Sequence, residues 1–138
     1  MMNRIFVDTN IVLDLLAKRE EFEATAEMFS LGDKGDLTIL VSSLSFSHIH
    51  YILRKILKDK TIPVLKELEL IVTITTVGER VIQLALNADD FKDFEDAIQY
   101  HCAIESAADI IITRNLKDFK ASELPVMTSS QFISSRKK

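Results

Sequence analysis

The sequence has little of what builds disulfide frameworks, long loops or membrane spans. Its 138 residues include one cysteine, Cys102, with 3 glycines, 2 prolines and no tryptophan. One cysteine excludes an intramolecular disulfide and a cysteine-rich zinc site. No apolar run approaches the roughly 18 residues that a membrane helix requires. Because Asp8 and Asp14 interrupt the apolar N-terminal stretch, a signal peptide is not expected. We therefore expect a cytoplasmic protein that does not enter a membrane.

What remains is the composition of a globular domain. Hydrophobic residues make up 47% of the chain and charged residues 28%, which argues against disorder. The net charge of −4 argues against wholesale non-specific binding to nucleic acid and leaves room for a local basic patch. We expect one domain over residues 1–138, with its core at about 4–133 and a frayed basic C-terminal tail.

Short apolar strands alternate with helical periodicity along the chain. The segment 108–115 contains three consecutive isoleucines, which is typical of a strand buried on both faces. This alternation predicts a three-layer α/β/α sandwich with a mostly parallel central sheet. The other expected strands are 3–7, 37–42, 72–77 and 124–129. The expected helices are 10–18, 21–31, 43–58, 62–71, 78–88, 93–108 and 129–135.

Polar residues follow the first strand and the isoleucine strand, where ligands bind in open α/β sheets. A further pair, Asp93 and Asp96, is spaced to share one face near the start of a helix. Converging carboxylates repel one another unless a cation lies between them, and oxygen ligands favour Mg²⁺ or Mn²⁺. Such a site suits a metal-dependent nuclease. The candidates are Asp8, Thr9, Asn10, Asp93, Asp96, Thr113, Arg114, Asn115 and Asp118.

The residues around the first strand also have structural interpretations. Asn10 is well placed to cap the helix that follows. Asp14 lies one helical turn further on, and we expect it to be a solvated surface acid. Asp8 is the hardest to explain structurally, because a carboxylate after a buried strand needs a partner or a metal.

The later candidates have structural alternatives of similar weight. Asp93 fits an N-cap, and Asp96 would then be stabilised by the helix dipole. Thr113 and Asn115 could simply satisfy a turn. Arg114 neighbours the candidate acids and could position a phosphate.

Three segments match one family when they are taken together. They are "FVDTNIVLDLL" near the N-terminus, "FEDAIQ" late in the chain and "IIITRNLKDF" after it. This combination resembles PIN-domain ribonucleases, which include the VapC-type toxins of bacterial toxin–antitoxin modules, and the resemblance extends from residue 4 to about 132. It implies a Mg²⁺ or Mn²⁺ site in which Asp8 and Asp96 bind the metal. Asn115, or as second choice Asp118, takes the position of a further acid or amide.

One departure from the family concerns a glutamate early in the third helix. The segment reads "VSSLSFSHIHYIL", and His48 stands where the glutamate is expected. Three alternatives follow. His48 could supply a nitrogen ligand, which favours Mn²⁺; Asp93 could supply the missing charge; or the enzyme could be weak or inactive.

The leading hypothesis is therefore a metal-dependent endoribonuclease, and the alternative is an inactive module that binds RNA or a protein partner. Thr9, Asn10 and Thr113 would orient carboxylates or waters, and Arg114 would hold the RNA backbone. The resemblance further implies an RNA substrate, a cognate antitoxin and a homodimer. The proposed catalytic residues are Asp8, Asp96, Asp93 and Asn115. The proposed metal ligands are Asp8, Asp96, Asp93 and His48.

Overall fold

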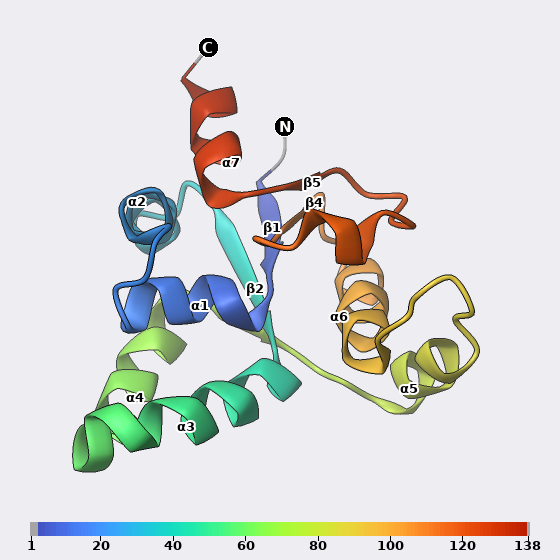
Figure 1. The fold of residues 1–138 in the computed structure, drawn as a ribbon. Helices are drawn as coiled ribbons and strands as arrows, with labels where there is room; N and C mark the ends of the chain where they lie inside the picture. The colour runs from blue at the N-terminus through green and yellow to red at the C-terminus, as the bar shows by residue number, and fades with distance from the viewer. Residues whose placement is uncertain (1–2, 138) are drawn as a thin grey trace.

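A five-stranded parallel sheet forms the centre of the molecule. The computed structural model describes residues 3–137, and its strands follow the order β3-β2-β1-β4-β5 (Figure 1). The strands are β1 (Arg4–Val7), β2 (Thr38–Ser42), β3 (Thr73–Thr75), β4 (Ile110–Ile112) and β5 (Val126–Met127). The helices are α1 (Thr9–Leu16), α2 (Phe22–Asp33), α3 (Ser43–Leu57), α4 (Thr61–Ile71), α5 (Glu79–Leu86), α6 (Phe94–Glu105) and α7 (Ser129–Arg136). Short 3₁₀ turns lie at Lys58–Lys60 and Leu116–Phe119.

Helices cover both faces of this sheet. Alternate side chains of a strand point to opposite faces, so Ile110 and Ile112 pack in one core and Ile111 in the other. The first core is closed by α1, α2, α3, α4 and α7, and the second by α5 and α6, which lie across the sheet in Figure 1. The predicted three-layer α/β/α sandwich with a parallel sheet is thus confirmed.

The central strand β1 delivers Asp8 to the carboxyl edge of the sheet. Ile5, Phe6 and Val7 are fully buried, because β1 lies between β2 and β4 and has helices on both faces. The register pairs Val7 with Ile112, so the residues after β1 and β4 emerge side by side. Asp8 and Thr113 are therefore neighbours although 105 positions separate them.

One local expectation about a helix cap was wrong. Asp8, and not Asn10, is the N-cap of α1, and its side chain accepts a hydrogen bond from the backbone N–H of Ile11. Asn10 lies within the first turn, because α1 begins one residue earlier than predicted, at Thr9. The carboxylate that was the strongest candidate for a site therefore also caps a helix.

The C-terminal helix is longer than expected. Thr128 and Gln131 form a capping box at the start of α7, which gives this short helix a defined beginning. The helix continues to Arg136, so the expected frayed tail is helical up to that point, and Lys138 lies outside the described residues. Within residues 3–137, no helix is both long and apolar enough to cross a membrane.

Candidate metal centre

A polar pocket opens where α1, α3, α6 and the loop after β4 meet at the carboxyl edge of the sheet. Three of the predicted site residues, Asp8, Asp96 and Asn115, come from separate segments and line it together. Thr9 and Asn10 line it as well. The complete lining consists of Asp8, Thr9, Asn10, His48, Ile52, Glu95, Asp96, Gln99 and Asn115.

Asp8 is a buried acid whose two oxygens are held in place. It is 8% exposed, and one carboxylate oxygen accepts from the N–H of Ile11 at 3.2 Å. The other accepts from the hydroxyl of Thr113, whose own oxygen accepts from the N–H of Asn115 at 3.1 Å. Burial raises the pKa of Asp8 from 3.8 to about 6, although the Thr113 hydrogen bond partly offsets this rise.

Asp96 is a half-buried acid in the first turn of α6. Burial raises its pKa from 3.8 to about 7, and the nearby carboxylates add to the rise. These carboxylates are those of Asp93, Asp118, Asp8 and Glu95. Two acids with raised pKa values therefore share one pocket, and a cation between them would relieve both burial and repulsion.

Asp93 and Asp118 lie outside this pocket. Asp93 is the N-cap of α6, with its side chain accepting from the N–H of Asp96 at 3.0 Å, so its structural interpretation is confirmed. Both acids line an adjoining pocket, and Asp96 lines both pockets. The remaining lining of that pocket is Asp90, Lys92, Lys117 and Lys120.

His48 lines the first pocket and faces α6. Its Nδ1 lies 3.7 Å from a carboxylate oxygen of Glu95, an exposed residue that was not among the candidates from the sequence. In the described part of the chain, no three His, Cys, Asp or Glu side chains are arranged to hold a metal ion. A metal held by Asp8 and Asp96 would therefore need neutral oxygens beside these two carboxylates.

Gln99 supplies such an oxygen and was also missed in the sequence. It is 5% exposed, and its amide nitrogen donates to the hydroxyl of Ser45 at 2.8 Å. Its carbonyl oxygen is buried and has no hydrogen-bond partner among residues 3–137. With Asp8, Asp96 and Asn115 it makes an all-oxygen donor set, which fits a hard divalent cation such as Mg²⁺ or Mn²⁺.

The sequence matches a known family over most of its length. Residues 4–117 match the model of the PIN domain family. The chain belongs to the PIN-domain family. It is 32% identical over 136 residues to a protein named Ribonuclease VapC1 from Aquifex aeolicus, with 94% of this chain and 92% of that protein covered.

Solved structures share the fold of this PIN domain. VapBC-1 from nontypeable Haemophilus influenzae has a TM-score of 0.71 at 17% identity, and 92% of this chain and 98% of that chain are covered. A toxin–antitoxin complex from Klebsiella pneumoniae has a TM-score of 0.71 at 20% identity, with 91% and 97% covered. At these identities the likeness shows the fold alone.

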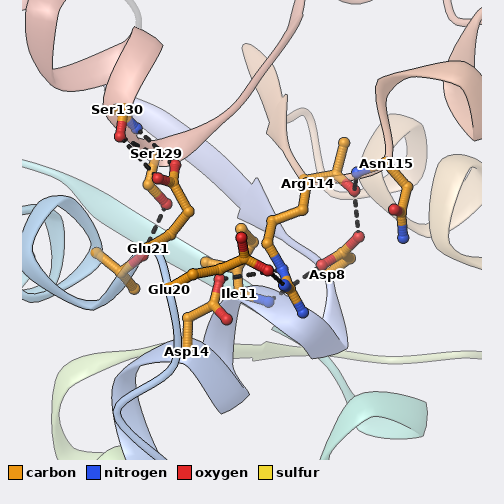
Figure 2. Close-up of polar contacts among 11 residues, drawn as sticks. Asp8, Ile11, Asp14, Glu20, Glu21, Arg114, Asn115, Ser129 and Ser130 are labelled. Carbon is orange, nitrogen blue, oxygen red and sulfur yellow. Dashed lines mark hydrogen bonds and ion pairs between the residues drawn. The ribbon is translucent and has the colours of Figure 1, made fainter.

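Arg114 of this PIN domain is not among the residues that line the pocket, and it enters an ion-pair network that the sequence did not reveal (Figure 2). Its Nε lies 3.3 Å from a carboxylate oxygen of Asp14, and its Nη1 lies 2.7 Å from one of Glu20. Asp14 is 0% exposed, so the expected solvated surface acid is in fact fully buried. Burial raises the pKa of Asp14, and the charge of Arg114 opposes that rise.

Two signals in the sequence could have identified these residues. Residues 11–13 and 15–16 are apolar, so the first helix is surrounded by protein and leaves no wet face for Asp14. Gln99 follows Asp96 by three positions, which places both on the same side of α6. Asp14 is thus a polar residue in a helix without a wet face, and Gln99 is a polar residue on the same side of its helix as a candidate acid.

The raised pKa of Asp8 predicts how stability changes with pH. From about pH 4 to 7 the folded state binds more protons than the unfolded state, so the free energy of unfolding falls as pH rises through about 6. Between pH 4 and pH 8 this effect should lower the free energy of unfolding of the metal-free, unmodified protein by about 2 kcal/mol. Asp8→Asn has no carboxylate to ionise at this position, so the variant should not show that loss. Urea unfolding in EDTA measures the effect. Asp59→Asn, at an exposed position, is the control, and an equal pH response in both variants would contradict the expectation.

The Asp14–Arg114 pair predicts a large effect from removing one partner. Arg114→Ala leaves the carboxylate of Asp14 buried without its counter-charge, which should destabilise the protein by roughly 3 kcal/mol. Glu20→Gln removes the exposed contact of the same guanidinium and should cost less than about 1 kcal/mol. Equilibrium unfolding at pH 7 compares the two. Similar small losses in both variants would show that Asp14 does not depend on Arg114.

Proposed function

We propose that this protein is a metal-dependent endoribonuclease that hydrolyses RNA phosphodiester bonds and is the toxin of a toxin–antitoxin module. The observation that carries the proposal is the pocket in which Asp8 and Asp96, both with raised pKa values, meet the amide oxygens of Gln99 and Asn115. The family relationship to a protein named as a ribonuclease supports the same reaction.

The residues of the pocket have distinct tasks in this reaction. Mg²⁺ or Mn²⁺, when bound, offsets charge on the scissile phosphate and makes water a nucleophile at neutral pH. Asp8 and Asp96 would hold the cation, and Thr113 and the N–H of Ile11 keep the carboxylate of Asp8 in a fixed orientation. Asn115 is exposed at the mouth of the pocket, where its amide can bind the cation or a phosphate oxygen.

The RNA backbone needs positive charge beside these acids. Arg114 is engaged by Asp14 and Glu20, so it is a poor candidate for the phosphate contact expected from the sequence. The adjoining pocket offers Lys92, Lys117 and Lys120 next to Asp96. We assign the backbone contact to these lysines.

The toxin role rests on the relatives. Structures that share this fold include VapBC-1 and a complex described as toxin–antitoxin, which supports a cognate antitoxin as the protein partner. The proposal places the protein in the cytoplasm, where its RNA substrate would be. A homodimer stays a prediction.

An inactive module that binds RNA or a protein partner is the second candidate function. The observation that favours it is His48 at the position where the family usually has a glutamate, paired with Glu95. In this alternative the pocket keeps its shape and binds no catalytic cation.

Removing either pocket acid should abolish cleavage and leave the fold intact. Asp8→Asn and Asp96→Asn keep the size of each side chain and lose its charge, so cleavage of a labelled RNA with Mn²⁺ should fall by about 100-fold or more. Asp59→Asn serves as the control on an exposed acid. Circular dichroism checks folding.

Two results would contradict the nuclease assignment. One is cleavage by Asp8→Asn at the rate of the unmodified protein, which would place the activity elsewhere. The other is cleavage that requires His48→Glu, since activity appearing only with the restored glutamate would identify the natural protein as the inactive module.

A further inference from the structure

Gln99 lines the pocket of Asp8 and Asp96 and carries a buried acceptor oxygen. Its side chain is 5% exposed and comes from the turn of α6 that follows Asp96. The carbonyl oxygen lacks a hydrogen-bond partner in the described residues, although buried amide oxygens nearly always have one. An acceptor left free at the wall of a polar pocket indicates that something in the pocket completes it.

A cluster of hydroxyl groups around Ser45 holds the amide of Gln99. The Ser45 oxygen accepts from the Gln99 amide nitrogen at 2.8 Å and from the Ser42 hydroxyl at 3.2 Å. These two donors occupy its lone pairs, so its proton goes to the hydroxyl of Thr9 at 2.9 Å. Ser45 therefore engages the amide nitrogen of Gln99, and the carbonyl oxygen is the end of the amide that lacks a partner in the described residues.

The chemistry of the pocket selects the partner of this oxygen. A phosphate oxygen is an acceptor and would be repelled by the carbonyl of Gln99 and by the carboxylates of Asp8 and Asp96. A cation, or water held by one, is attracted by all three groups. The third acid of the lining, Glu95, is exposed and lies 3.7 Å from His48, and no three acids within residues 3–137 are arranged to hold a metal. A buried neutral oxygen is what this pocket adds to Asp8 and Asp96.

We propose that Gln99 is a further ligand of the divalent cation, and that its carbonyl oxygen takes the place of a third acid. Ser45 is the positioning residue, because it binds the amide nitrogen of Gln99 and links it to Thr9. The inference rests on the proposed function. Since Gln99 carries no charge, the site has one negative charge fewer than a site with three acids, and adding that charge should tighten metal binding.

Manganese affinity tests this assignment without measuring catalysis. Mn²⁺ binding, followed by electron paramagnetic resonance at pH 8, should weaken about 10- to 100-fold in Gln99→Met, which keeps the length of the side chain and removes its acceptor. Ser45→Ala should weaken binding less, because it frees the amide and leaves it present. Gln99→Glu should tighten binding about tenfold or more through the added charge.

The matched controls lie on α5, at Gln83, which is exposed. Gln83→Met and Gln83→Glu make the same changes far from the pocket and should leave Mn²⁺ affinity unchanged. Circular dichroism verifies each fold. If Gln99→Met does not fold, Gln99→Glu decides alone, since it is nearly isosteric with the natural residue.

The outcomes separate this inference from the proposed function. Unchanged affinity in Gln99→Met or in folded Gln99→Glu, with binding lost in Asp8→Asn, overturns the role of Gln99 and leaves the nuclease proposal standing. Affinity that is the same in Asp8→Asn as in the unmodified protein overturns both, because the cation then binds outside this pocket. Weaker binding in Gln99→Met together with tighter binding in Gln99→Glu supports the assignment.

Discussion

The burial of the Asp8 carboxylate is the constraint on which the rest of the site depends. A parallel strand covered on both faces ends at Val7, and the next side chain is an acid that the sheet and its helices shield from water. Burial raises its pKa to about 6, and it shares its pocket with Asp96, whose pKa is about 7. A small cation bound between the two carboxylates would compensate both acids at once.

Three consecutive residues after β4 connect this site to the scaffold. Thr113 donates to Asp8, Arg114 pairs with the fully buried Asp14 of α1, and Asn115 reaches the pocket. The charge of Arg114 lies near Asp8 as well as Asp14 and lowers the pKa of both acids. The ion pair thus anchors α1 to the loop after β4, and it helps to hold Asp8 and Asn115 in their positions at the pocket.

The fold could be read from the sequence because it rests on local patterns. Three consecutive isoleucines in β4 and the alternation of strands with helices are enough to predict a parallel sheet covered on both faces. Local patterns mark Asp14 and Gln99 as polar residues in buried surroundings, but they do not reveal the partners, because Arg114 and Ser45 each lie more than 50 residues away. Asp93 shows most clearly what the sequence leaves open, because its position fits both a metal ligand and an N-cap. The structure distinguishes the two interpretations, because it shows Asp93 as the N-cap of α6 and places it in the adjoining pocket.

The number of protons released when Mn²⁺ binds tests most directly whether the cation binds at Asp8 and Asp96. Calorimetry in buffers of different ionisation enthalpy counts them, with Asp8 titrating near 6 and Asp96 near 7. About one proton per Mn²⁺ should be released at about pH 6.5 and almost none at about pH 8.5, because the cation displaces the protons that the two acids still hold. Proton release that is absent at about pH 6.5 while Mn²⁺ binds would contradict this expectation, since the cation would then occupy a site whose acids are already ionised.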